Sequence, residues 1–432
     1  MKNFYKKSVI LIAIFFAYQL VSGQEIAKQL IVASGGSFSN PDDYVSMSAF
    51  DPLNQTSNEF NTIFTQSVQD IIIEDNFAYV AAQDSIIKYD IETFTRLSAI
   101  AESNLNRLFI FDDKLVVSRQ TGTAGPPTDG YYVKIFNASD LSLIANIAGI
   151  SSDAASSILV NDSLYVAISG TWEASEGKLA IIDTDNFELG REINFGTEAV
   201  GIYNLYSIGD TIYSVNKSPY LATSGSITKY NSINSSFSTT THQFVFGKGV
   251  GNDGNILYLG LNHGIGSYNL FNNEIIDEEI VPDPGSASYI SICDGSFDHV
   301  NDLIYVTISD YYSFGEGKIY DLSGTLTGTF EAGISPEAIA LQFVDESGIE
   351  NNTENIMFSF YPNPVSDVLN IRFTENNIPD EIFITDVFGR QIYNSKTLKS
   401  GNNNIDFSIF PSGLYFLNLI FGNKKIIEKI IK

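Results

Sequence analysis

Four aromatic side chains stand in segments rich in Gly, Pro and Ser, where they could recognise a ligand. They are Trp172, Tyr220, Tyr311 and Tyr312, and Arg119 begins a further segment of this kind. Exposed rigid rings make contact area at low entropic cost, and a guanidinium can hold a carboxylate or a phosphate. These five residues therefore predict a binding site for a planar or ring-shaped ligand such as a sugar. The alternative, that the rings fold back and pack their own segments, stays open at this point.

Motifs for catalysis are missing from the sequence. There is no Gly-x-Ser-x-Gly elbow, Walker loop, His-Glu-x-x-His pair or EF-hand loop. Gly249–Gly254 has the spacing of a dinucleotide-binding loop, but a strand pattern follows where that chemistry needs a helix N-terminus, so we predict a turn. His242, His263 and His299 share no motif and are expected to be polar surface residues. We therefore predict no catalytic residue, no metal site and no cofactor, and we expect binding rather than turnover.

Charge and cysteine content exclude several classes of function. The 432 residues include 24 Lys and Arg against 51 Asp and Glu, a net charge of -27, so nucleic acid would be repelled. Cys293 is the only cysteine and cannot form an internal disulfide, and one Cys with three His is too few for a structural zinc site. Because residues 1–23 carry three positive charges and residues 358–432 a net charge of +1, residues 24–357 carry -31. This acidity favours solubility, and it could also attract cationic ligands.

A repeat organises the middle of the chain. A turn residue followed by a short aromatic or β-branched strand recurs at residues 76–80, 113–117, 162–166, 210–214, 255–259 and 302–306, with fourth positions 37, 49, 48, 45 and 47 residues apart. A second strand pattern follows each copy, at residues 87–90, 134–137, 180–183, 228–231, 266–269 and 318–321. Periods of this length with several strands in each unit are typical of β-propeller blades.

The two ends of the repeat region predict how the ring closes. Six copies are complete, while Gln29–Ala33, Asp43–Phe50 and Phe60–Thr65 could supply outer strands and Glu337–Phe343 an inner strand. Joining them makes a seventh blade and removes the exposed sheet edges of an open array. We therefore predict an all-β fold with a seven-bladed β-propeller. A six-bladed ring with an irregular N-terminal extension is the alternative.

Loop lengths favour one face of this ring. In a four-stranded blade, the loop between the second and third strands and the link to the next blade emerge on the same face. Residues 119–130, 169–177, 216–225 and 309–317 form long versions of that loop and hold the aromatic residues and Arg119. The predicted binding site therefore lies on this face.

The first 23 residues predict export. Three lysines precede an apolar run, Val9–Tyr18, which is followed by small residues up to Gly23. This is the pattern of a cleaved secretory signal peptide, and the run is too short to span a bilayer. The predicted organisation is a signal peptide (1–23), the propeller (24–345), a polar linker (346–357) and a small Ig-like β-sandwich (358–432).

Residues 358–432 carry several specific motifs. They are Tyr361-Pro362-Asn363-Pro364, the turn Asp386–Arg390, the run Ser412–Tyr415 and the lysines Lys424, Lys425 and Lys429. This segment resembles the type A C-terminal sorting domain of the type IX secretion system of Bacteroidetes. The resemblance implies that the type IX machinery is a partner and that the protein crosses the outer membrane. The domain is then commonly removed as the protein is attached to lipopolysaccharide, so the expected location is the cell surface or the medium.

Residues 24–345 resemble, in their blade pattern, the YncE-like surface propellers of Bacteroidetes. Some of these capture cobalamin for a TonB-dependent outer-membrane transporter, so the resemblance implies capture of a nutrient such as a corrinoid. The chain lacks the cysteine of those lipoproteins after the signal peptide, and no ligand motif can be transferred. Two other functions stay open: a propeller enzyme that acts on extracellular polysaccharide, and an adhesion or scaffold module that binds protein or glycan.

Overall fold

The computed structural model describes residues 24–37, 39–346, 358–373, 378–387, 389–421 and 424–432, so the predicted signal peptide lies outside the described residues. The chain divides into two compact units, of which one spans Ile26–Val344 and the other includes residues 345–432. Strands form both units, with two short 3-10 turns, η1 (Thr197–Ala199) and η2 (Ser286–Ser288), in the described part. No helix in that part is long and apolar enough to cross a membrane.

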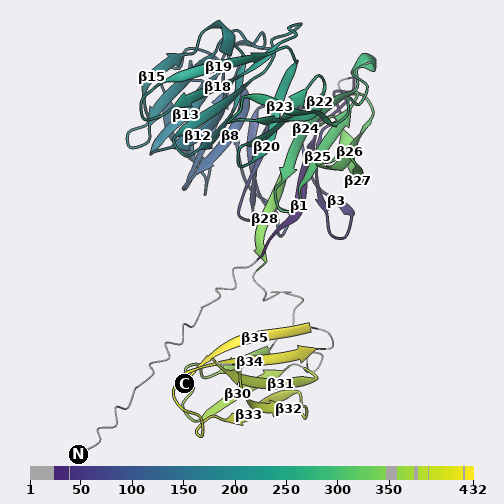
Figure 1. The fold of residues 1–432 in the computed structure, drawn as a ribbon. Coiled ribbons are helices and arrows are strands. Elements are labelled where there is room, and N and C mark those ends of the chain that lie inside the picture. The colour runs from purple at the N-terminus through teal and green to yellow at the C-terminus, as the bar shows by residue number, and fades with distance from the viewer. Residues whose placement is uncertain (1–23, 38, 347–357, 374–377, 388, 422–423) are drawn as a thin grey trace, which may run out of the picture. The chain divides into compact units, whose positions relative to one another are not determined.

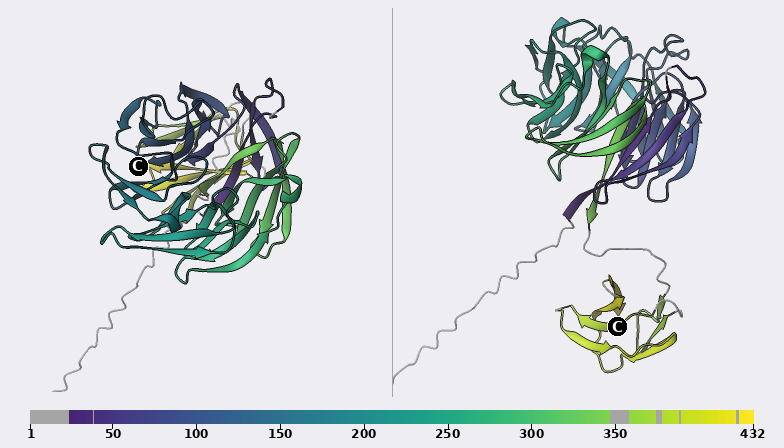
Figure 2. Two further views of the ribbon diagram at one scale, coloured as in Figure 1. Left: turned by 90° about the horizontal axis from the view of Figure 1, so that it is seen from above. Right: turned by 90° about the vertical axis from the view of Figure 1, so that its right-hand side faces the viewer.

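The larger unit is a β-propeller of seven four-stranded antiparallel blades (Figure 1, Figure 2). Blade 1 contains β4 (Asp70–Glu74), β5 (Phe77–Ala82), β6 (Ser85–Asp90) and β7 (Thr95–Ala101). Blade 2 contains β8 (Leu105–Phe111), β9 (Lys114–Arg119), β10 (Val133–Asn137) and β11 (Leu143–Ile147). Blade 3 contains β12 (Ala154–Val160), β13 (Ser163–Ile168), β14 (Lys178–Asp183) and β15 (Glu188–Asn194). Blade 4 contains β16 (Ile202–Ile208), β17 (Thr211–Asn216), β18 (Gly225–Asn231) and β19 (Phe237–His242). Blade 5 contains β20 (Phe246–Asp253), β21 (Ile256–Leu261), β22 (Gly264–Asn269) and β23 (Glu274–Val281). Blade 6 contains β24 (Ser291–Asp298), β25 (Leu303–Ser309), β26 (Phe314–Asp321) and β27 (Leu326–Ile334). The first strand of each blade is the innermost, so these strands surround the centre of the ring.

Burial explains why the two repeated patterns are so regular. The second strands, such as β5, β9 and β13, are buried along nearly their whole length, because neighbouring blades cover both faces of each sheet. Outer strands such as β7 are largely exposed, so their sequences vary more from blade to blade. The first repeated pattern falls on the second strands and the second pattern on the third strands, which confirms the predicted blade assignment.

The seventh blade is built from both ends of the propeller sequence. Its strand order is β28 (Pro336–Glu346), β1 (Gln24–Ser34), β2 (Val45–Asp51) and β3 (Thr56–Ile63). In Figure 1, β28 and β1 lie side by side at the point where the chain enters and leaves the ring. The predicted closure and the count of seven blades are therefore confirmed, and the six-bladed alternative is wrong.

The glycine-rich segment Gly249–Gly254 is mostly strand rather than the predicted turn. It forms the end of the innermost strand β20, whose register against β21 shifts at Gly249 and again before Gly251. A Cβ on Gly249 would lie 2.2 Å from the Tyr206 hydroxyl, and one on Gly251 would lie 2.6 Å from Cβ of Phe297. These glycines allow the inner strands of blades 4, 5 and 6 to approach closely. The turn itself is confined to the region of Gly254, where φ is 52°.

The smaller unit is an Ig-like sandwich of two antiparallel sheets. One sheet contains β29 (Phe358–Tyr361), β30 (Val368–Phe373) and β33 (Gly401–Asp406), and the other contains β32 (Gln391–Ser395), β31 (Glu381–Asp386), β34 (Leu414–Phe421) and β35 (Lys424–Ile431). Leu369, Ile384 and Leu417 lie at the centre of its core. Every residue of this core belongs to the sandwich, so the unit has its own hydrophobic core.

Candidate binding site

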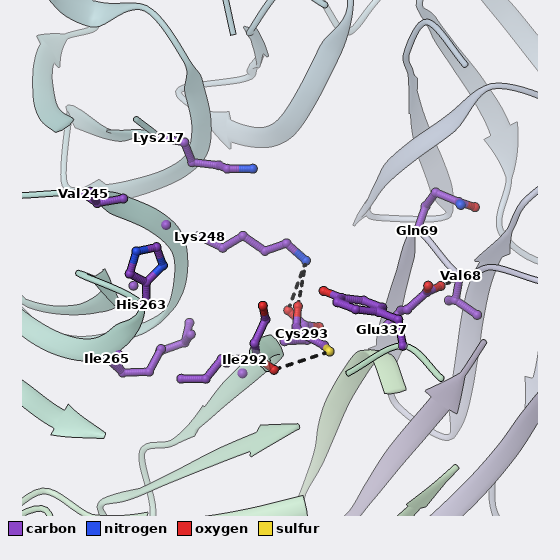
Figure 3. Close-up of a pocket in the computed structure, with 18 of the residues that line it drawn as sticks. Val68, Gln69, Lys217, Val245, Lys248, His263, Ile265, Ile292, Cys293 and Glu337 are labelled. Atoms are coloured by element: carbon purple, nitrogen blue, oxygen red, sulfur yellow. Dashed lines mark hydrogen bonds and ion pairs between the residues drawn. The ribbon is translucent and has the colours of Figure 1, made fainter. Parts of the chain in front are cut away.

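A cavity of about 540 Å³ opens at the centre of the ring (Figure 3). It is lined by the first residues of the inner strands β20, β24 and β28, by the segment before β4, and by the loops β21–β22 and β25–β26. Inner strands begin on the face where the loops between second and third strands emerge. The cavity therefore lies on the face that loop lengths predicted.

Two lysines point into this opening from different blades. Lys248 on β20 places Nζ 3.6 Å from Oδ1 of Asp294 and 3.4 Å from the carbonyl oxygen of Cys293. Lys217, the first residue after β17, places Nζ 4.3 Å from the ring centroid of Tyr203. Figure 3 shows both side chains reaching toward the centre, and no carboxylate of the described residues pairs with Lys217.

A buried ion pair lies close enough to the lysines to act on them electrostatically. Nη1 of Arg107 on β8 lies 2.7 Å from Oδ1 of Asp70 on β4, and Nε of Arg107 donates to the Tyr203 hydroxyl at 3.1 Å. Burial opposes ionisation of Tyr203, but Arg107, Lys217 and Lys248 together lower the pKa of its phenol. Burial also lowers the pKa of Lys217, and the two other cations add to this effect. Three basic groups are thus close enough to act on one another.

The opposite wall presents groups that are neutral at slightly acidic pH. Burial raises the pKa of Glu337 to about 7, although the backbone N–H of Val68 donates to its Oε2 at 2.6 Å and Lys248 favours the charged form. Burial likewise raises the pKa of the Cys293 thiol to about 11, so this residue is a thiol at neutral pH. A carboxyl whose pKa is raised in a cavity is a candidate functional group.

Replacing Glu337 by Gln should change how stability depends on pH. The folded-state pKa of about 7 exceeds the ordinary value of 4.5, so the folded chain binds more protons between these values and the wild type loses stability as pH rises through that window. Glu337→Gln cannot ionise and keeps an acceptor for Val68. We expect the variant to match the wild type at about pH 5 and to be the more stable protein at about pH 8, measured by urea unfolding. The exposed Glu188→Gln serves as control, and an equal difference at both pH values would contradict the assignment.

Of the predicted aromatic residues, Tyr311 is the one that lines the cavity. Its backbone φ is 66°, in the left-handed region, as it is at Tyr289. Oδ1 of Asp310 accepts hydrogen bonds from the backbone N–H groups of Tyr312 and Ser313, which fixes the loop in this shape. Tyr312 is 59% exposed on the same loop.

Trp172 and Tyr220 form a separate aromatic pair on the same face. Their ring centroids lie 6.2 Å apart at an interplanar angle of 60°, between the long loops of blades 3 and 4. Trp172 is 75% exposed and Tyr220 is 74% exposed. Neither ring is buried by its own loop, so the pair is available to a ligand or a partner.

The structure corrects the prediction that Arg119 faces a ligand. Its side chain is 2% exposed, with Nη2 3.0 Å from Oε1 of Glu102 and Nη1 2.6 Å from Oδ1 of Asp129. Lys134 contacts the same two carboxylates. Position 119 ends a second strand, which neighbouring blades cover, so the guanidinium holds the base of its loop instead of facing a ligand.

Sequence reasoning missed Lys217, Lys248 and Glu337. Lys217 had a usable signal, since it lies in the long loop that holds Tyr220 and is one of only 13 Lys and Arg in the acidic residues 24–357. Lys248 and Glu337 lie near the starts of inner strands, whose sequences differ from blade to blade. Tyr289, 87% exposed on the link from blade 5 to blade 6, was also missed because only the loops within blades were considered.

Comparison with known families concerns the smaller unit. Residues 359–432 match the family described as the secretion system C-terminal sorting domain. This unit is a type IX sorting domain. The protein is therefore exported to the cell surface or secreted, and the predicted location is confirmed. No curated protein matches the chain.

Comparison with solved structures concerns the fold of the larger unit. The chain is similar to a protein from Lactobacillus plantarum (11% identity, TM-score 0.54, covering 73% of this chain and 100% of that one). It is also similar to a hypothetical selenium-binding protein from Sulfolobus tokodaii (12%, 0.52, 74% and 91%) and to a putative 6-phosphogluconolactonase from Bacteroides fragilis (13%, 0.51, 74% and 98%). At these identities the similarity shows the propeller fold alone.

Proposed function

We propose that the exported propeller is a binding protein whose ligand enters the central cavity and contacts the aromatic residues on the same face. The observation that carries this proposal is the position of Tyr311, which a loop held by Asp310 places against the cavity. A cavity with a few convergent polar groups is also the usual form of a small-molecule site.

The aromatic pair supports an extended contact surface around the opening. Trp172 and Tyr220 are exposed although each would be more stable in contact with other apolar groups. Tyr312 and Tyr289 add exposed rings to the same face. A ligand with one part in the cavity and a planar or ring-shaped part on these rings would satisfy both features.

Replacing Tyr311 or Trp172 by Ala should weaken ligand binding by about 1 to 4 kcal/mol. The melting temperature should change little for Trp172→Ala, because the ring packs against little besides Tyr220. Affinity would be measured by calorimetry for whichever corrinoid or oligosaccharide raises the melting temperature in a ligand screen. Phe271→Ala is the matched control, since this ring is 58% exposed in a β22–β23 loop on the opposite face. Loss of stability without loss of affinity would instead mean that the rings only pack their loops.

An enzyme that acts on extracellular polysaccharide is the second candidate, and Glu337 is the residue that favours it. A carboxyl with a pKa of about 7 can give or take a proton near neutral pH. Product released from any screened glycan by the wild type but not by Glu337→Gln would establish turnover and replace the binding proposal. Capture of a corrinoid for a TonB-dependent transporter, and adhesion, stay predictions that the same ligand screen tests.

A further inference from the structure

Basic residues are concentrated near the central cavity, in a domain that is otherwise strongly acidic. Residues 24–357 carry a net charge of -31 and hold 13 Lys and Arg. Three of these, Arg107, Lys217 and Lys248, act electrostatically on the single Tyr203 phenol. Lys217 and Lys248 line the cavity itself, while Arg107 lies among buried residues next to Tyr203.

Two of the three cations have carboxylate partners, and the third has none among the residues that the structure describes. Asp70 lies 2.7 Å from Arg107, and Asp294 lies 3.6 Å from Lys248. Lys217 contacts only the face of Tyr203 among the described charged and aromatic groups. Lys217 thus has no carboxylate partner among the described residues, and its side chain projects into the cavity (Figure 3).

We propose that the cavity recognises an anionic group of its ligand, a carboxylate or a phosphate-like oxyanion, held between Lys217 and Lys248. This inference rests on the proposed binding function and names the chemical class of the ligand. A partly buried ammonium without a counter-ion is costly, and an incoming anion would lower that cost while gaining charge-assisted hydrogen bonds. Lys248 is not tightly held, because its distance to Asp294 is long for an ion pair, so it can turn toward an anion.

The neutral wall of the cavity complements this arrangement. Glu337 is protonated at mildly acidic pH and can donate a hydrogen bond to an anion instead of repelling it. The overall negative charge of the domain would repel anions at other places on the surface. Anion binding should therefore be confined to this opening.

The test uses residues 24–432, with sulfate as the tetrahedral probe and oxalate as the carboxylate probe. Both keep a constant charge at mildly acidic and neutral pH, and glucose serves as the neutral probe. Calorimetry at constant ionic strength would compare the wild type with Lys217→Met, Lys217→Arg and Lys229→Met. Lys229 is the matched control, because its Nζ lies over the Tyr213 ring at 5.6 Å and it does not line the cavity.

We expect at least one of the two anions to bind saturably to the wild type and to Lys229→Met. Lys217→Met should weaken that binding about tenfold or more, and Lys217→Arg should retain most of it. The anion that binds better identifies the carboxylate or the oxyanion as the preferred group. Absence of saturable anion binding, or binding that Lys217→Met leaves unchanged, would overturn the inference. If a neutral ligand binds and depends on Tyr311, the proposed binding function stands while the anion assignment fails.

Discussion

A chain that ends before residue 358 should fold its propeller and yet fail to reach the cell surface. The sorting domain directs export, so its removal should leave the protein inside the outer membrane. The propeller should be unaffected because the two hydrophobic cores share no residue and the two units are separate in the pattern of contacts. We expect the fraction of the protein found outside the cell to fall from nearly all to nearly none.

The measurement is digestion of intact cells with a protease, followed by detection of the propeller in cell fractions. A matched control fuses residues 346–432 to a periplasmic reporter protein, which should then appear outside the cell. The melting curve of the truncated chain checks that its propeller is folded. Finding the truncated chain on the surface would show that the export signal lies elsewhere.

Much of the fold could be predicted because the second and third strands of each blade face the same environment. Equivalent positions such as Val80, Val117 and Val166 lie between two neighbouring blades and are completely buried, so the same residue types return in each repeat. Inner strands lack this constraint. They carry polar residues that pair with the neighbouring blade, such as Asp70 with Arg107 and Lys248 with Asp294, and their sequences differ from blade to blade.

The candidate site could be predicted only as a face of the ring. Loop lengths located the face and the aromatic residues on it, because loop position follows from the strand order of a blade. Which side chains meet at the centre depends on contacts between distant parts of the chain, such as the 2.6 Å hydrogen bond from the backbone N–H of Val68 to Glu337. Arg119 was misplaced for a related reason, since its partners Glu102 and Asp129 are not identifiable from sequence spacing.

Removal of residues 24–65 should destabilise the whole propeller and not only its seventh blade. These residues provide β1, β2 and β3, so their loss leaves β28 without a neighbour and breaks the ring. Two hydrophobic clusters lose members at once: the cluster of Phe50 with Phe330 on blade 6, and the cluster of Met47 with Tyr89 on blade 1. The exposed core and open sheet edges should also promote aggregation.

A buried polar network adds to the cost of opening this blade. Nε2 of Gln29 on β1 donates to Oε1 of Gln342 on β28 at 2.8 Å and to the carbonyl oxygen of Ile91 at 2.9 Å. Nε2 of Gln342 donates in turn to the carbonyl oxygen of Asp75 at 3.0 Å. Both ends of the propeller sequence are thus joined to blade 1, and Gln342 is completely buried. Loss of β1 would remove Gln29 and leave Oε1 of Gln342 and the carbonyl oxygen of Ile91 without this donor, which is costly inside a protein.

A milder variant makes the same prediction measurable in a soluble protein. Phe50→Ala should cost about 3 to 5 kcal/mol, a large part of the stability of a typical domain, whereas Leu97→Ala on the outer strand β7 should cost little because Leu97 is half exposed. Urea unfolding would be followed by circular dichroism and by the fluorescence of Trp172, which lies on blade 3 and reports on a distant part of the ring. Both signals should shift together in Phe50→Ala if the closed ring unfolds as one unit. A shift in circular dichroism with an unchanged Trp172 transition would mean that the seventh blade opens alone, and that closure through the chain ends does not hold the rest of the propeller together.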